Sequence, residues 1–329
     1  MGVRKYSVGV DIGGTNIKFG IFDATGKLLL QRKIATDPER GSDAVLSAVT
    51  QQIHSMLAAL SLRADDLTGI GLGVPGTADS VTGTVVYAPN LFWKNVPVAT
   101  AIQSSFGVPL FIAQDTRAAA WAEYLVGSGQ GCRGLAAVTL GTGIGCGMVM
   151  DGKIFHGALN TAGEFGHQIV ELDGELCNCG RRGCLEAHAG GLAIVRQAKK
   201  RIPHLGTLLG KDSAAISVAD VFQLAQQGNP PARQLTQDAV RYIGIGLVNL
   251  INLTSVERIC ISGGISNAPR ELLMEPLIAF VRERAYQAIS GRVQISKSTL
   301  GEDAPLIGAA LLHRAFAHPA AHPAAARAE

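Results

Sequence analysis

The sequence predicts an α/β fold of two lobes that share one building plan. Residues 6–34 alternate short apolar runs with Gly-Gly-Thr and Ala-Thr-Gly turns, and residues 134–157 repeat this strand, glycine turn, strand pattern. Segments with helical spacing follow each strand set. With 329 residues, of which 47% are apolar and 17% charged, the chain can fill two cores. We expect a cleft between the lobes, where ligands usually bind.

The first lobe is expected to begin with a β-meander over residues 6–34. A helix over residues 42–60 follows, because its apolar residues fall on one face at 3.6-residue spacing. Strands are predicted near residues 69–74 and 110–113, and a further helix near 116–126.

The second lobe begins with the strand set at residue 134. Its predicted helices lie near residues 186–201, 218–227, 232–253 and 270–289, with a strand at 258–262 and a closing helix at 304–316. We therefore divide the chain into a small lobe over 1–115, joined by helix 304–316, and a large lobe over 116–303. Residues 317–329 are low in complexity, and we expect a disordered tail.

The charge pattern argues against nucleic-acid and membrane partners. The net charge of +3 comes from 29 basic and 26 acidic residues without a run of five like charges. The uncharged stretch over 134–150 contains five glycines and two threonines, which favours strand, turn and strand over a membrane span. Asp11 interrupts the first apolar run too early for a signal peptide, so we expect a cytoplasmic protein.

Glycine-rich turns supply the first functional signal. Asp11, Gly13, Gly14 and Thr15 lie between two predicted strands, where bare backbone amides and a hydroxyl can bind phosphate. Asp11 could hold Mg²⁺ directly or through water. An isolated Gly-Gly pair is more often an ordinary hairpin turn.

Repetition of such turns favours a nucleotide site over three unrelated turns. Gly141, Thr142 and Gly143 form a second turn at the matching place in the second lobe. Gly263 and Gly264 follow the strand at 258–262, where small residues would let a nucleobase or ribose lie against the backbone.

Clustered cysteines predict a metal site. Cys177, Cys179 and Cys184 fall within eight residues, and His167 lies ten residues upstream of the first. Three thiolates and an imidazole suit Zn²⁺, and four protein ligands leave no position for a catalytic water, so the zinc would be structural. The alternative is a group of free or redox-active thiols.

An acidic residue stands where it could do chemistry. Asp115 follows the strand at 110–113 and begins a helix, so it could act as general base toward an alcohol that attacks a phosphoryl group. The alternative is a helix N-cap. Asn90, Glu164, His167 and Glu186 form a polar set that could bind sugar hydroxyls, although each taken alone is more often a surface or capping residue.

Taken together, these motifs resemble the ROK family of sugar kinases and repressors, and most closely its bacterial glucokinases, from about residue 8 to 315. The resemblance rests on six segments, which read DIGGTNIK at 11–18, GVPG at 73–76, PN at 89–90, LGTGIG at 140–145, AGEFGH at 162–167 and CNCGRRGCLE at 177–186. The last of these is the most specific. The family belongs to the actin/hexokinase-like superfamily, so the resemblance implies a duplicated, ribonuclease H-like α/β fold with an interlobe cleft.

The resemblance also implies residue roles. Asp115 would be the catalytic base toward the sugar 6-hydroxyl, as the γ-phosphoryl group of Mg-ATP is transferred. His167 would bind Zn²⁺ through one ring nitrogen and the sugar through the other. The expected sugar-binding residues are Gly76, Asn90, Asp115, Glu164, His167 and Glu186. The expected nucleotide-binding residues are Asp11, Gly13, Gly14, Thr15, Asn16, Lys18, Gly141, Thr142, Gly143, Gly263 and Gly264. The expected zinc ligands are His167, Cys177, Cys179 and Cys184.

Two positions depart from the family pattern. Gln114 stands before the expected base where the family usually has Asn, and Arg117 stands two residues after it where Asn is also common. Arg117 could lower the pKa of the base, contact the substrate or face solvent. The sequence does not decide whether the sugar substrate is glucose, mannose, N-acetylglucosamine, N-acetylmannosamine or fructose. It also does not decide whether the phosphoryl donor is ATP or polyphosphate.

The resemblance further implies a homodimer or homotetramer that binds small molecules only. The repressors of the family would need a helix-turn-helix domain ahead of the first glycine turn. Only ten residues precede Asp11 here, so we expect a kinase.

Overall fold

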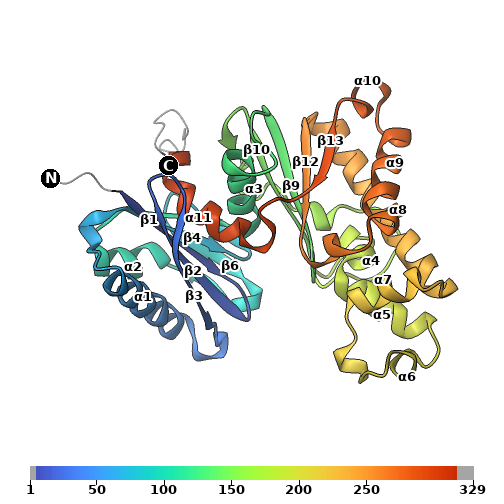
Figure 1. Cartoon of the computed structure of the whole chain (residues 1–329), viewed down its shortest axis with the longest axis horizontal. Coiled ribbons are helices and arrows are strands. Elements are labelled where there is room, and N and C mark those ends of the chain that lie inside the picture. Colours follow the sequence, from blue (N-terminus) through green and yellow to red (C-terminus); the bar gives the residue numbers. More distant parts are fainter. Residues whose placement is uncertain (1–4, 317–329) are drawn as a thin grey trace. The chain divides into compact units, whose positions relative to one another are not determined.

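The computed structural model describes residues 5–316 and forms two compact units (Figure 1). Of the described residues, the first unit comprises 5–126, 147–162 and 303–316, and the second comprises 127–146 and 163–302. The tail expected to be disordered, residues 317–329, lies outside the described residues.

The first unit is built on a five-stranded sheet of order β3-β2-β1-β4-β8. The strands β1, β2 and β3 form the predicted antiparallel meander, and β4 pairs in parallel with both β1 and β8. Their bounds are Tyr6–Ile12, Asn16–Asp23, Leu28–Ala35, Leu67–Val74 and Leu110–Gln114 in chain order. Both β1 and β8 therefore end at the same edge, which carries Asp11 near the end of β1 and Asp115 directly after β8.

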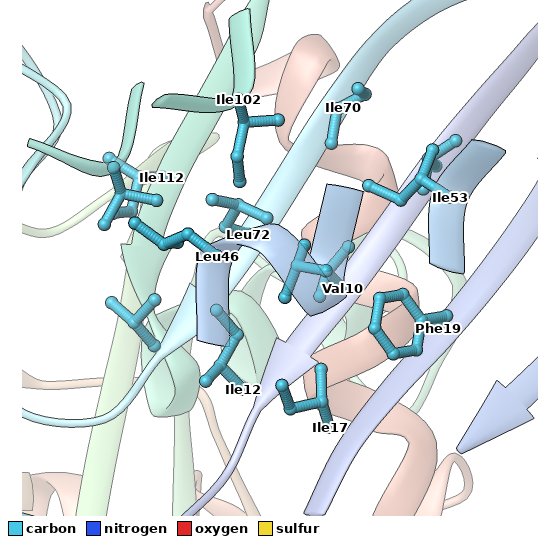
Figure 2. Packing of buried hydrophobic residues seen from close by; sticks show 14 of the residues in the cluster. Val10, Ile12, Ile17, Phe19, Leu46, Ile53, Ile70, Leu72, Ile102 and Ile112 are labelled. Carbon is cyan, nitrogen blue, oxygen red and sulfur yellow. The ribbon is translucent and has the colours of Figure 1, made fainter. Parts of the chain in front are cut away.

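Apolar side chains of the central strands pack against α1 (Ser42–Ala59) and α2 (Val98–Phe106). Figure 2 shows Val10 and Phe19 of the sheet near Ile53 of α1. These side chains are almost fully buried, as the 3.6-residue spacing of the sequence predicts. This core fixes the strands whose ends carry the candidate site.

Two further helices of the first unit, α3 (Asp115–Val126) and α11 (Ala304–Phe316), pack tightly together. The indole Nε1 of Trp121 donates to the Leu311 carbonyl oxygen at 2.9 Å. The unit boundary therefore falls after Val126, whereas the sequence placed it after residue 115. The contact with α11 draws α3 into the first unit, and no local sequence pattern reports such a contact.

A small antiparallel sheet in the first unit was not anticipated. It consists of β5 (Thr77–Asp79), β6 (Thr84–Ala88) and β7 (Trp93–Val96). The strands have three to five residues each, too few to show a clear alternation. This sheet places Gly76 and Asn90 at its ends.

The second five-stranded sheet has the order β11-β10-β9-β12-β13 and so repeats the plan of the first. Its strands β10 and β11 are antiparallel, and β12 is parallel to β9 and β13. The bounds are Gly134–Leu140, Ile144–Met150, Lys153–Ile154, Arg258–Ser262 and Gln294–Lys297 for β9 to β13. The predicted duplication is confirmed.

The helices of the second unit follow the predicted order with three differences, of which one is the short helix α6, which was not predicted. Instead of one helix over 186–201 there are two, which meet at Gly190, a residue with extended backbone. Instead of a helix over 270–289 there are two shorter ones, α9 and α10. The helices α4 to α10 span Leu185–Ala189, Gly191–Arg201, Leu205–Leu209, Val218–Gln226, Pro230–Thr254, Met274–Arg284 and Gln287–Ser290.

Within the described part of the chain, none of the helices combines the length and apolar character that a membrane crossing requires.

Candidate active site

Two carboxylates of the first unit meet at the ends of neighbouring strands. Asp11 lies near the end of β1, and Asp115 is the first residue of α3, directly after β8. Gly73 of β4 lies between them, and a Cβ placed there would be 3.7 Å from Asp11 Oδ1 and 3.7 Å from Asp115 Cα. Both acids are therefore within van der Waals reach of the same position of β4. One oxygen of Asp115, Oδ1, accepts the Thr116 amide at 2.7 Å.

The environment of Asp11 disfavours its negative charge. Burial raises the pKa of Asp11 from 3.8 to about 7, and the nearby charges of Asp115 and Asp303 act in the same direction, while Lys18 acts against them. Lys18 Nζ lies 3.4 Å from Asp303 Oδ1. A set of carboxylates that repel one another is stabilised by a divalent cation, and oxygen ligands of this kind suit Mg²⁺.

The first glycine turn lies against a residue expected to bind sugar. Gly13 donates its amide to the Asn16 carbonyl oxygen at 2.9 Å, and Thr36 Oγ1 donates to the Gly13 carbonyl oxygen at 2.7 Å. A Cβ at Gly14 would be 3.4 Å from the Cβ of Asn90, which stands in the turn after β6. The fold therefore brings the candidate phosphate loop and a candidate sugar ligand together within one unit.

The second glycine turn is tied to Glu186 of α4. Gly141 donates its amide to the Gly143 carbonyl oxygen at 2.9 Å, and Glu186 Oε2 accepts the Ile144 amide at 2.8 Å. Gly143 is required here because the Glu186 carboxylate occupies the place of its Cβ. One oxygen of Glu186 is thus committed to this turn, and Oε1 is the oxygen that a sugar hydroxyl could use.

The third glycine pair lies beside the second turn, because β9 and β12 are parallel neighbours with Ser262 opposite Thr139. Their hydroxyl oxygens lie 3.2 Å apart. A Cβ at Gly264 would meet no atom within 4 Å, and Gly264 borders a cavity of about 130 Å³. The cavity is lined mainly by apolar groups, including Phe222 and Ile265, which is a suitable surface for a nucleobase.

The predicted zinc ligands converge. The ligand atoms of His167, Cys177, Cys179 and Cys184 all lie within 4.8 Å of one another. The sulfur atoms of Cys179 and Cys184 are 3.7 Å apart, and Cys177 Sγ is 3.8 Å from His167 Nδ1. A tetrahedral ion with metal–sulfur bonds of about 2.3 Å needs sulfur atoms about 3.8 Å apart, so the four groups fit Zn²⁺.

The same histidine presents its second nitrogen to a candidate sugar ligand. Nδ1 of His167 faces the cysteines, and Nε2 lies 3.8 Å from Glu164 Oε2. Glu164 directly precedes a 3₁₀ turn over Phe165–His167, and His167 is the last residue of that turn. A metal on Nδ1 would therefore fix the ring with Nε2 directed toward Glu164.

Arg117, which departs from the family pattern, does not face solvent. Its side chain is buried, with 2% of its surface exposed. Nη1 of the guanidinium donates a hydrogen bond to Asn160 Oδ1 at 3.1 Å. Nη2 donates to the backbone carbonyl oxygens of Asn160 and Ala162 at 3.0 and 2.9 Å. The expectation that Arg117 could face solvent is therefore wrong, because its side chain is buried and hydrogen bonded to other residues of the protein.

The family model described as "ROK family" matches residues 7–315. The chain is a ROK protein. This assignment covers both units and all six motifs that the sequence shares with the family.

Individual ROK relatives are similar along almost their whole length. A glucokinase of Halalkalibacterium halodurans is 31% identical over 309 residues, which is 92% of this chain and 93% of that protein. The crystal structure of a ROK family glucokinase from Streptomyces griseus in complex with glucose and AMPPNP is 34% identical, with a TM-score of 0.77 over 94% of this chain and 99% of that one.

A regulator is also similar. The structure of a ROK family transcriptional regulator, a homologue of the E. coli MLC protein, is 28% identical with a TM-score of 0.82, over 95% of this chain and 79% of that one. The actin/hexokinase-like α/β fold that the sequence predicts is confirmed by these neighbours.

Two residues that contact the candidate site are not predicted by the sequence. Asp303 lies 285 positions beyond Lys18 and meets it only through the fold. Thr36, after β3, holds the first glycine turn through both its hydroxyl and its amide. Neither belongs to a motif, so only a prediction of long-range contacts could have found them.

Proposed function

We propose that this ROK protein is an ATP-dependent hexose kinase, with glucose as its substrate, that phosphorylates the sugar 6-hydroxyl. The observation that carries the proposal is the pairing of Asp115 with Asp11 beside a glycine turn that touches Asn90. Likeness to a glucokinase that binds glucose and AMPPNP supports the choice of sugar and donor.

In the proposed reaction Asp115 accepts the proton of the sugar 6-hydroxyl. The sugar oxygen forms a bond to the γ-phosphorus as the bond from that phosphorus to the β-phosphate oxygen breaks, and ADP leaves. The amides of the turns at Gly13 and Gly143 would hold the phosphate oxygens. Mg²⁺, held by Asp11, would neutralise charge on the phosphates.

The remaining roles follow the same plan. Gly76, Asn90, Glu164, His167 and Glu186 would hold the sugar hydroxyls. Gly14, Thr15, Asn16, Lys18, Gly141, Thr142, Gly263 and Gly264 would complete the nucleotide site. Zn²⁺ would brace His167 and so orient its free nitrogen. Assembly into a homodimer or homotetramer is part of the proposal, and light scattering after size-exclusion chromatography measures it.

Loss of the zinc should weaken sugar binding. Cys179 is exposed, so Cys179→Ser removes one metal ligand without opening a cavity in a core. We expect zinc content to fall and the glucose dissociation constant to rise by about tenfold, because the metal no longer fixes the orientation of the His167 ring. Elemental analysis and calorimetry measure the two quantities. Cys132→Ser, a buried cysteine outside the cluster, is the control. Unchanged glucose affinity in folded, metal-free protein would contradict the role of zinc.

The activity is tested with a panel of hexoses. Glucose, mannose, fructose, N-acetylglucosamine and N-acetylmannosamine are each incubated with ATP and, separately, with polyphosphate. We expect the highest kcat/KM for glucose with ATP. A different best sugar would correct the substrate but keep the kinase. Sugar binding without phosphoryl transfer to any of them would instead favour a sugar-responsive regulator.

A further inference from the structure

A buried arginine lies two residues after the proposed base, in the first turn of the same helix. Arg117 is the third residue of α3, the helix that begins with Asp115. A buried guanidinium is costly unless its N–H groups are hydrogen bonded, because it loses its hydration. Three hydrogen bonds join the Arg117 guanidinium to Asn160 and Ala162. Both belong to the segment that follows β11.

Asn160 links three parts of the first unit. Its Oδ1 accepts from Arg117 and lies 3.1 Å from His156 Nδ1, and its Nδ2 donates to the Ala78 carbonyl oxygen at 2.7 Å. Its φ of +57° is a left-handed conformation, which asparagine adopts more readily than most residues. The segment also closes on itself, since the Ala162 amide donates to the His156 carbonyl oxygen at 3.0 Å.

Each arm of this network ends beside a proposed sugar-binding segment. Ala78 lies two residues after Gly76, within β5. Ala162 directly precedes Gly163 and Glu164. Arg117 lies two residues after Asp115. The guanidinium and the Asn160 amide therefore tie the base to the chain segments that lead into the sugar ligands.

We infer that Arg117 and Asn160 form a positioning pair that holds two segments of the first unit relative to Asp115, namely β5, which follows Gly76, and residues 156–162, which lead into Glu164. The inference rests on the proposed hexose kinase function and adds two residues to it. Neither residue needs to touch the substrate. A buried charge that served stability alone could be replaced by an apolar side chain at little cost, whereas a planar donor with several fixed bonds defines a geometry.

Three variants separate the arms of the network. Asn160→Gly keeps the left-handed backbone and removes the side-chain contacts with Arg117, His156 and Ala78. Asn160→Asp keeps the acceptor for Arg117 but loses the donor to Ala78. Arg117→Met removes the charge at similar length. The control is Arg258→Met, because Arg258 also donates to a backbone oxygen, that of Ser128 at 2.6 Å, but within the second unit.

We expect Asn160→Gly and Arg117→Met to raise the hexose KM by about ten- to hundredfold, the loss expected for a charged hydrogen bond, with the ATP KM unchanged. The rise in the double variant should be smaller than the product of the two single rises, since both single variants remove the bond between the Arg117 and Asn160 side chains. Asn160→Asp should fall between wild type and Asn160→Gly. Arg258→Met should keep the wild-type hexose KM.

Hydrogen exchange supplies a readout that needs no activity. The Ala162 amide should lose protection in Asn160→Gly and Arg117→Met, while amides of β1 and β4 keep theirs. A wild-type hexose KM in Asn160→Gly, or equal rises in hexose and ATP KM, would overturn the inference. If wild-type protein phosphorylates no hexose, the proposed function fails instead, and the exchange data still decide whether Arg117 and Asn160 order this segment. Should Arg117→Met not fold, Asn160→Gly carries the test.

Discussion

Replacing Asp115 with Asn should lower kcat by about a hundred- to ten-thousandfold, the usual contribution of a general base. Asn has the same shape but cannot take up the proton of the sugar hydroxyl. The Thr116 amide, which donates to Asp115 Oδ1, can donate equally to an amide oxygen, so the start of α3 should stay intact. Binding of glucose and nucleotide should therefore persist while phosphoryl transfer is lost.

Steady-state kinetics and calorimetry on the same preparation test this expectation. Asp37→Asn is a matched control, because Asp37 is an exposed residue of the first unit whose left-handed backbone Asn also tolerates. Activity above a few per cent of wild type in Asp115→Asn, with sugar still bound, would show that another group accepts the proton.

Replacing Asp11 with Asn should have opposite effects on activity and stability. Activity should fall by about a hundredfold or more, because the proposed Mg²⁺ ligand is lost. The nucleotide-free protein should become more stable at alkaline pH, because Asn needs no ionisation in a site where burial and two neighbouring acids disfavour a charge.

The sign of the stability change follows from the pKa. The pKa of Asp11 rises from 3.8 to about 7 on folding, so between these values the native state keeps a proton that the unfolded chain has released. The free energy of unfolding therefore falls as pH rises through this window, and the full cost is present above it. Asp11→Asn removes this cost, which is about 4 kcal/mol at pH 8 and about 2 kcal/mol at pH 5.

Urea unfolding of wild type and Asp11→Asn at pH 5 and pH 8, without nucleotide or Mg²⁺, measures the effect. A gain in stability that is equal at the two pH values would contradict the raised pKa of Asp11. Retained activity in the variant would separately contradict its role toward Mg²⁺.

The parts of the site that the sequence predicts are those fixed by short-range chemistry. Three cysteines within eight residues can meet at one point whatever the rest of the chain does, and the structure brings them together with His167. A strand followed by Asp and a helix likewise predicts where Asp115 lies, at the junction of β8 and α3. The duplicated sheets follow from the repeated strand and turn pattern.

The parts that escaped depend on contacts between distant segments. Asp303 influences Asp11 only because α11 returns to the first sheet, and α3 joins the first unit for the same reason. Arg117 was identified as unusual, yet its partner lies 43 residues away and has no motif. Long-range packing, rather than local propensity, decides these features.

The central claim is that this chain moves the γ-phosphoryl group of ATP onto the 6-hydroxyl of a hexose. Phosphorus-31 NMR of a reaction with glucose, ATP and Mg²⁺, run beside one with 6-deoxyglucose, tests it most directly. The account predicts glucose 6-phosphate and ADP in the first tube, and no sugar phosphate in the second. Phosphate on another hydroxyl, or ATP left intact beside bound glucose, would contradict it.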